Sequence, residues 1–293
     1  MASELTKLRI GQFSESPVLS IARALGLDKE FGVDWVTERV VSSPAQFQAL
    51  ASGEMDIAIT SPDNVMLYST TDANPIKKRL DLALLRPIDR GMGLALFSSD
   101  QIKNPGDFAG TKLGVDVPHS GFAFLLLAML AQLGLDRSSI ELESVGATPK
   151  RLGAIIEGLV SGSILNAETS IAAKKQGLTQ WLTSADISEN YLGTVLTEVA
   201  GVHSDSTSRF LDLWEEATKS ILTLPPEELI GLLANSSPDL ASVEYVALVQ
   251  SSDFGLIKES EVTKDQLLIL SEIRSNCGAY SPAEEAISEL LSR

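Results

Sequence analysis

The chain has little of several residue types, and each shortage excludes a class of protein. A single cysteine, Cys277, excludes an intramolecular disulfide framework and a thiolate metal cluster. Aromatic residues make up 5% of the 293 residues, and 39 acidic side chains outnumber 23 basic ones, which leaves a formal charge of −16. Because nucleic-acid binding needs basic surface and rings that stack on bases, we expect no nucleic-acid partner.

Long apolar runs are also missing. The longest, over residues 122–135, is interrupted by polar and small residues and is shorter than the roughly 20 residues that a bilayer span needs. Residues 1–9 are mixed in charge, with no apolar segment typical of a secretory leader. We expect a protein that is not membrane-embedded, cytoplasmic if Met1 is the native start and periplasmic or extracytoplasmic if a leader was removed.

Sequence signatures of common cofactor and catalytic sites are absent as well. The glycines form neither G-x-G-x-x-G nor a P-loop, and there is no G-x-S-x-G. His119 and Asp116 together are too few for a metal site, which needs three or four converging ligands. The sequence therefore predicts no cofactor and no metal.

What the sequence does have is a repeated alternation of strands and helices. The first passage predicts strands at 8–13, 33–41 and 55–60 and helices at 18–25 and 45–51; the second predicts strands at 112–115, 140–145 and 164–168 and helices at 121–133 and from 148. Such alternation favours parallel strands joined by right-handed crossovers. We expect an α/β fold with mostly parallel sheets flanked by helices.

The two passages can be superimposed in sequence. The matched segments are residues 25–28 with 133–136, 43–44 with 148–149, and 58–61 with 167–170. An offset of about 105 to 109 residues indicates two similar lobes, although any two strand–helix–strand units share some likeness. From residue 206 the chain predicts five helices, which we expect to cover the first lobe.

Two passages resemble a known family. LASGEMDIAIT (50–60) and DFAGTKLGV (107–115), together with the repeat, are similar to the periplasmic-binding-protein type II fold. The most similar group is the alkanesulfonate-, nitrate- and taurine-type solute-binding proteins with the related thiamine-pyrimidine-precursor (NMT1/THI5-like) proteins. The second lobe departs from the family pattern, because Leu165 stands where the family repeats an aspartate equivalent to Asp56.

The resemblance implies an architecture and a function. Lobe 1 would comprise residues 1–88 with 195–293 and lobe 2 residues 89–194, with crossovers near 86–91 and 191–194 and a ligand cleft between the lobes. The lobes would close by hinge motion on a small polar metabolite. The implied role is an ABC-transporter-type substrate-binding protein, a monomer with a small-molecule ligand and an ABC permease as partners.

The turns that the resemblance places at the cleft give the candidate ligand-binding residues. They are Phe13, Ser14, Glu15, Ser61, Asp63, His119, Ser120, Gly121, Glu168 and Thr169. Three of them, Ser14, Ser61 and Ser120, could equally cap the helix that follows. Helix N-termini favour an anionic ligand, whereas Glu15 and Glu168 facing inward would favour an amine.

Other functions remain open from the sequence. His119, with Glu15 or Glu168, could act as an acid/base pair in a cytosolic enzyme on the same fold, a desulfinase, decarboxylase or hydrolase-like lyase. The turn at residues 14–16 lacks the cysteine that the resemblance implies for a desulfinase. His119 could also bind a ligand oxygen or cap a helix. A ligand-sensing module is a third possibility, although no helix-turn-helix precedes the first strand.

Overall fold

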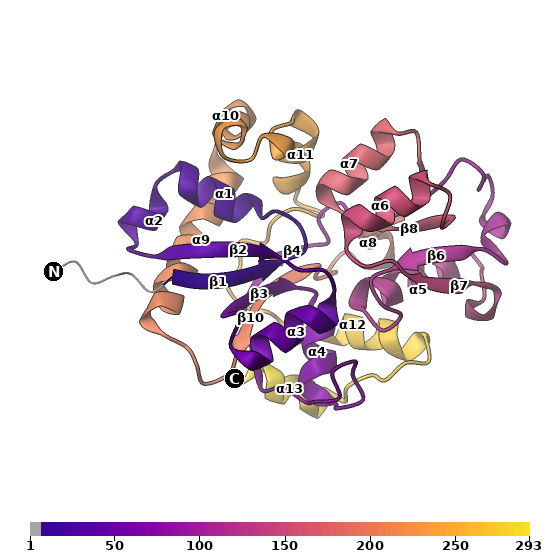
Figure 1. The fold of residues 1–293 in the computed structure, drawn as a ribbon, viewed down its shortest axis with the longest axis horizontal. Helices are drawn as coiled ribbons and strands as arrows, with labels where there is room; N and C mark the ends of the chain where they lie inside the picture. Colours follow the sequence, from indigo (N-terminus) through magenta and orange to yellow (C-terminus); the bar gives the residue numbers. More distant parts are fainter. Residues whose placement is uncertain (1–6) are drawn as a thin grey trace.

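The computed structural model describes residues 7–293 and contains two five-stranded sheets, which lie side by side in Figure 1. The first has β1 (Lys7–Gln12), β2 (Asp34–Arg39), β3 (Ile57–Thr60), β4 (Leu82–Asp89) and β10 (Thr194–Val199), in the order β2-β1-β3-β10-β4. The second has β5 (Ala95–Ser98), β6 (Lys112–Val115), β7 (Glu141–Ser144), β8 (Gly162–Leu165) and β9 (Thr179–Thr183), in the order β7-β6-β8-β5-β9. We call the first sheet with its flanking helices lobe 1 and the second lobe 2.

The two sheets have equivalent topologies. In lobe 1, β1 pairs in parallel with β2 and β3, and the antiparallel β10 lies between β3 and β4. In lobe 2, β6 pairs in parallel with β7 and β8, and the antiparallel β5 lies between β8 and β9. The antiparallel strand is in each case the one that follows directly after the chain crosses over from the other lobe. This arrangement confirms the predicted α/β fold with two similar lobes.

Helices connect the parallel strands. They are α1 (Pro17–Ala24), α2 (Leu27–Glu30), α3 (Ser43–Ser52) and α4 (Pro62–Thr70) in lobe 1, and α5 (Gly121–Gln132), α6 (Thr148–Ile156), α7 (Ala167–Lys175) and α8 (Ser184–Ile187) in lobe 2. Four of them, α1, α3, α4 and α6, have proline in the first turn, where its missing N–H removes no intrahelical hydrogen bond. The helices predicted at 18–25, 45–51 and from 148 therefore correspond to α1, α3 and α6.

One repeated segment lies out of the predicted register. The third strand of lobe 2 is β8, which ends at Leu165, so residues 167 and 168 open α7 and do not belong to a strand ending at 168 as predicted. Asp56 donates its N–H to the Arg9 carbonyl (2.9 Å), and Ser161 makes the same bond to the Lys112 carbonyl (2.8 Å). Ser161, and not Leu165, is therefore the counterpart of Asp56.

The C-terminal helices contact both lobes. They are α9 (Asp205–Thr223), α10 (Pro226–Ser236), α11 (Val243–Val249), α12 (Lys264–Asn276) and α13 (Glu284–Leu291). Helices α9 and α10 pack on α1 as expected, but α11 packs on α7 of lobe 2, and α12 contacts both α4 and α5. Figure 1 shows α10 and α11 on one side of the molecule and α12 and α13 on the opposite side. The expectation that the tail covers lobe 1 alone was too narrow.

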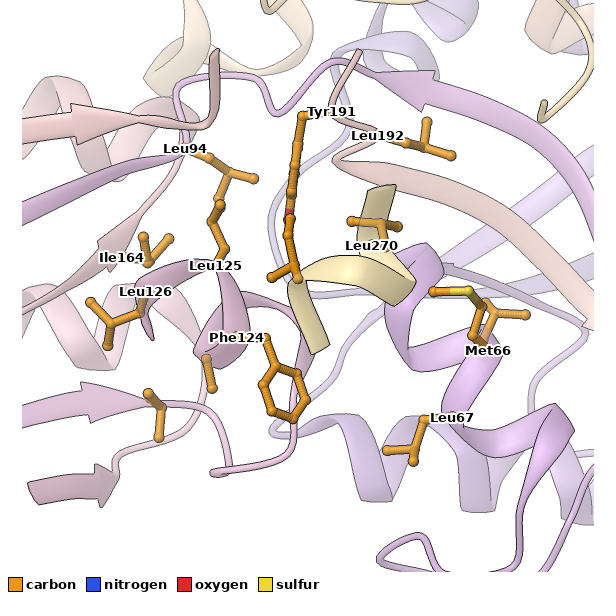
Figure 2. Packing of buried hydrophobic residues seen from close by; sticks show 14 of the residues in the cluster. Met66, Leu67, Leu94, Phe124, Leu125, Leu126, Ile164, Tyr191, Leu192 and Leu270 are labelled. Atoms are coloured by element: carbon orange, nitrogen blue, oxygen red, sulfur yellow. The ribbon is translucent and has the colours of Figure 1, made fainter. Parts of the chain in front are cut away.

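The apolar interior continues from one lobe into the other. Tyr191 and Leu192, on the return crossover, belong to the same buried cluster as Leu125 of α5, Leu270 of α12 and Met66 of α4. Figure 2 shows these side chains lying across the junction. The helices of the two lobes are thus linked by apolar packing on the side that α12 covers. No helix within residues 7–293 has the length and hydropathy required to cross a membrane.

Candidate ligand-binding site

A cavity of about 90 Å³ lies between the lobes, where parallel strands end and helices begin. Open α/β sheets usually bind ligands at the carboxyl ends of their strands. Both lobes, both crossovers and the C-terminal part contribute to the cavity. Its lining is Phe13, Ser14, Glu15, Ser16, Pro17, Ile59, Thr60, Ser61, Asn64, Ile88, Asp89, Met92, Leu94, Asp116, Ser120, Phe122, Thr148, Arg151, Asn166, Ala167, Thr194 and Leu256.

Several polar atoms of the lining have no hydrogen-bond partner among residues 7–293. They are the hydroxyls of Ser14, Ser61 and Ser120 and the Oδ1 atom of Asp116. Ser61, Ser120 and Asp116 are only 5%, 4% and 7% exposed. A buried polar group without a partner costs about 1–3 kcal/mol, so most such groups in folded proteins are satisfied. Four unsatisfied atoms around one cavity indicate a place for a polar ligand.

The crossovers meet at Asp89, which also lines the cavity. Its carboxylate accepts hydrogen bonds from the N–H groups of Gly91 (2.8 Å) and Met92 (2.9 Å) on the outgoing crossover and from the hydroxyl of Thr194 on the return. Burial raises the pKa of Asp89, and these hydrogen bonds oppose the rise. A methyl group on Gly193 would lie 2.6 Å from the Gly91 Cα and would also overlap the Asp89 carboxylate. The two crossovers therefore pass so close to each other that a side chain at residue 193 does not fit.

A third segment passes the same point. The N–H of Ile257 donates to the Ile88 carbonyl (2.8 Å), and the N–H of Arg90 donates to the Gly255 carbonyl (3.1 Å). Leu256, between them, brings an apolar side chain of the C-terminal part into the cavity wall. No local sequence pattern places Leu256 at the site, because the residues that pair with its neighbours lie more than 160 residues earlier in the chain.

Hydrogen bonds join the two lobes beside the cavity. The N–H and hydroxyl of Ser43, at the start of α3, donate to Asp116 Oδ2 of lobe 2 (3.0 and 2.7 Å). The N–H of Gly121 donates to Asn64 Oδ1 of α4 (3.3 Å). A methyl group on Gly121 would lie 2.5 Å from the Ser61 hydroxyl, so these two lobes touch closely. The structure is a conformation in which the lobes are in contact.

Arg151 of α6 is a buried cation of the lining that the sequence reasoning missed. It is 2% exposed, and it donates to the carbonyls of Gly146 (3.0 Å) and Ile164 (3.3 Å) and to the hydroxyl of Thr148 (2.9 Å). Burial lowers its pKa to about 10, and the nearby carboxylate of Asp116 opposes this, so Arg151 carries its charge at neutral pH. A signal existed, because residues 151, 154 and 155 form the buried face of α6 and place an arginine among apolar positions.

Half of the predicted ligand-binding residues line the cavity, namely Phe13, Ser14, Glu15, Ser61 and Ser120. Gly121 does not, but its N–H forms the contact between the lobes described above. Thr169 does not line the cavity either. Its hydroxyl accepts a hydrogen bond from the Asn166 N–H (3.0 Å) and donates one to the Asn166 carbonyl (2.6 Å) at the start of α7.

Asp63 also lies outside the cavity lining. Its Oδ2 accepts a hydrogen bond from Nη1 of Arg274 on α12 (2.6 Å), and both side chains are buried. Burial raises the pKa of Asp63 to about 6, against the effect of the arginine. The expectation of Asp63 as a ligand contact therefore gives way to a structural ion pair between α4 and the C-terminal part.

Glu168 and His119 were the other predicted polar contacts. Glu168, half-buried near Ser14, does not line the cavity; burial raises its pKa, and the charge of Arg39 opposes the rise. His119 is exposed and lies outside the lining. Glu15 Oε1 already accepts hydrogen bonds from Ser20 (3.3 Å) and Ser237. The acid/base pair of His119 with Glu15 or Glu168 is therefore not assembled at this cavity, and no group of three or more metal-ligating side chains occurs in the described residues.

Comparisons with known proteins agree with this geometry. A family model described as NMT1/THI5 like matches residues 19–228. A search of curated proteins found no match.

Solved structures similar to the chain include three solute-binding proteins. The alkanesulfonate-binding protein SsuA from Xanthomonas axonopodis pv. citri, bound to MOPS, is 16% identical with a TM-score of 0.76, covering 99% of both chains. The periplasmic nitrate-binding protein NrtA from Synechocystis PCC 6803 is 13% identical with a TM-score of 0.77, covering 98% of this chain and 85% of its own. A ligand-binding component of an ABC-type import system from Staphylococcus aureus, with zinc bound, is 13% identical with a TM-score of 0.72, covering 98% and 99%. At these identities the likeness establishes a shared fold.

Proposed function

The chain belongs to the NMT1/THI5-like family, and from that premise we propose that it binds one small polar metabolite in the cavity between its lobes. The observation that carries the proposal is the set of four unsatisfied polar atoms around the cavity, contributed by both lobes. A bound solute would satisfy them, whereas an empty closed cavity would leave them without partners. The family and the names of the similar structures, which bind sulfonate and nitrate, support solute binding over catalysis.

The cavity supports a small ligand. One water molecule needs about 10–15 Å³ of such space, so 90 Å³ corresponds to a solute of several non-hydrogen atoms. Apolar side chains such as Phe13, Met92 and Phe122 share the lining with the polar groups. A compact metabolite with a polar end and a short apolar part matches this composition.

Ligand binding is proposed to depend on hinge closure about the crossovers at Asp89 and Thr194. The predicted division into residues 1–88 with 195–293 and residues 89–194 places the hinge at the same point. The hydrogen bonds between the lobes, Ser43 to Asp116 and Gly121 to Asn64, would form on closure and break on opening. Delivery to an ABC permease by a monomeric chain is proposed from the family resemblance, and the ABC-type import system named for one similar structure supports it.

Calorimetry and thermal shift with small acids, amines and amino acids test the proposal. We expect one class of compound to bind with a micromolar Kd and to raise the melting temperature. Ser61→Ala with Ser120→Ala should weaken that binding, because two hydroxyl contacts are lost. Ser52→Ala, at the exposed end of α3, is the matched control and should bind normally. A protein whose melting temperature is indifferent to the whole collection would contradict the proposal.

A further inference from the structure

Two opposite charges are buried at the cavity with unused bonding capacity. Asp116 has one oxygen, Oδ2, held by Ser43, and a second, Oδ1, without a partner among the described residues. Arg151 has five N–H donors by its chemistry and uses three in hydrogen bonds to the protein. No ion pair of 4.0 Å or less joins Asp116 to Arg151 in residues 7–293, although the carboxylate is near enough to influence the pKa of the arginine.

The other carboxylates of the lining are already in use. Asp89 accepts three hydrogen bonds from the crossovers. Glu15 accepts from Ser20 and Ser237 through Oε1, and its Oε2 lies 4.0 Å from Nη2 of Arg39. Glu168 has an oxygen without a partner but does not line the cavity. Asp116 is therefore the lining carboxylate with an oxygen left for a ligand.

Burying a charge is costly unless an opposite charge or hydrogen bonds compensate it. An anionic ligand would satisfy Arg151 but would leave the Asp116 oxygen uncompensated, and a cationic ligand would do the reverse. From this balance, and resting on the proposed function, we propose that the ligand is a small zwitterion. Its ammonium group donates to Asp116 Oδ1, and its anionic group, a carboxylate, sulfonate or phosphonate, accepts from Arg151 and the hydroxyls of Ser61 and Ser120.

The same geometry gives Asp116 a second role, as the residue that couples binding to closure. Its Oδ2 holds Ser43 of lobe 1, while its Oδ1 contacts the ammonium group. A ligand that fixes this carboxylate also fixes the acceptor of the two Ser43 hydrogen bonds. The ammonium group is thus recognised by the side chain that holds the lobes together, and we expect it to contribute to closure as well as to affinity.

Matched triads of compounds test the zwitterion. Each triad contains a zwitterion, its analogue without the ammonium group and its analogue without the anionic group, for example β-alanine, propionate and propylamine. Calorimetry should find the best ligands among the zwitterions, with each analogue binding roughly tenfold or more weakly, because a lost charge-assisted hydrogen bond is worth at least that factor. Binding that is as tight for an anion or amine alone would overturn the proposal.

Two variants separate recognition from closure. Asp116→Asn retains an acceptor oxygen for Ser43 but removes the charge, so we expect the affinity ratio of zwitterion to deaminated analogue to fall towards one. Ser43→Ala removes one of the two bonds to Oδ2 and leaves Oδ1 unchanged, so it should weaken every ligand but lower the ratio much less than Asp116→Asn does. An unchanged ratio in Asp116→Asn would refute the role of Asp116, and a melting temperature close to that of the unmodified protein confirms that each variant folds.

The outcomes also distinguish this proposal from the proposed function. If no zwitterion binds but an anion, amine or neutral compound in the wider screen does, the zwitterion is wrong and solute binding stands. If nothing in either collection binds, both fail.

Discussion

The two lobes share a topology but pair their charged side chains differently at equivalent places, most clearly where the third parallel strand passes into a helix. In lobe 1 the junction is Ser61-Pro62-Asp63, and in lobe 2 it is Asn166-Ala167-Glu168. Asp63 is ion-paired with Arg274, with both side chains buried. Glu168 has no ion pair of 4.0 Å or less in the described chain and lies near Ser14 of the opposite lobe.

A second pair of positions differs in the same way. Arg9 of β1 makes two side-chain hydrogen bonds to Asp56, at 2.9 and 2.6 Å, ahead of β3. In lobe 2 the same positions hold Lys112 and Ser161, and Lys112 pairs with Glu141 and Glu143 of β7 instead. The repeated pattern of strands and helices determines the backbone of both lobes. The pairing of charges depends on residues that have no counterpart in the other lobe, such as Arg274 of α12 for Asp63.

Arg274→Ala should have the largest effect, because it leaves Asp63 buried without its cation. We expect a loss of about 3–5 kcal/mol in the free energy of unfolding, measured by urea denaturation. The double variant Asp63→Asn with Arg274→Met should recover most of this loss, because neither buried charge then remains. A loss no larger than that of Glu168→Gln would remove the contrast between the lobes.

Gly193→Ala tests the close packing of the crossovers and should rank second. Its methyl group would overlap Asp89 and Gly91, and overpacking of this kind costs about 1–3 kcal/mol. Gly153→Ala, in α6, has no atom within 4 Å of the new methyl and should raise stability by about 0.5–1 kcal/mol. Thermal unfolding of both variants measures the difference, and equal effects would show that the crossovers have spare room.

Asp56→Asn addresses the second pair of positions. Burial opposes ionisation, but hydrogen bonds from the side chain and backbone of Arg9 hold the pKa of Asp56 below its ordinary value. Its contribution is therefore present above about pH 4 and is lost as the pH falls through the lowered pKa. Since Arg9 is 40% exposed, we expect a loss of only about 0.5–1 kcal/mol at pH 7. Ser161→Ala, at the equivalent position of lobe 2, should lower the free energy of unfolding by less. A larger loss for Ser161→Ala than for Asp56→Asn would contradict the difference between the lobes.

Glu168→Gln should have the smallest effect, seen best in its pH dependence. Because burial raises the pKa of Glu168, the folded state binds this proton more readily than the unfolded state does. The contribution of Glu168 to the free energy of unfolding therefore falls as the pH rises from its ordinary pKa through the raised one. The glutamine variant should lack this decline and gain stability relative to the unmodified protein as the pH rises above the ordinary pKa of glutamate. If the glutamine variant instead loses stability as the pH rises, Glu168 is stabilised as a carboxylate.

Local patterns were sufficient to predict the fold. The helices predicted at 18–25, 45–51 and from 148 match α1, α3 and α6, each with proline in its first turn, and the repeat indicated two lobes. The register of β8 was missed because Asn166 caps α7 directly after a four-residue strand, whereas the apolar pattern extends to Ala167. Ala167 adopts a φ of 39°, a left-handed conformation rare for alanine, which no sequence pattern predicts.

Five of the ten predicted ligand contacts line the candidate cavity. Ser14, Ser61 and Ser120 lie at strand ends, where local sequence is informative. Asp63 was misplaced because its partner, Arg274, is 211 residues away, and Leu256 was missed for the same reason. Arg151 was overlooked because a charged residue on a helix is usually exposed. Contacts between residues far apart in the sequence therefore decide which polar residues at the strand ends remain free to contact a ligand.

The placement of β10 also bears on how the chain folds during synthesis. All five strands of lobe 2 lie between residues 95 and 183, so that sheet can form from one continuous stretch as it leaves the ribosome. Lobe 1 lacks an interior strand until residue 199 has emerged, and Asp63 lacks its ion-pair partner until Arg274 has emerged. We expect the second sheet to mature first, and β1, β2 and β3 to stay without the interior strand β10, and so accessible to chaperones and proteases, until residue 199 has emerged.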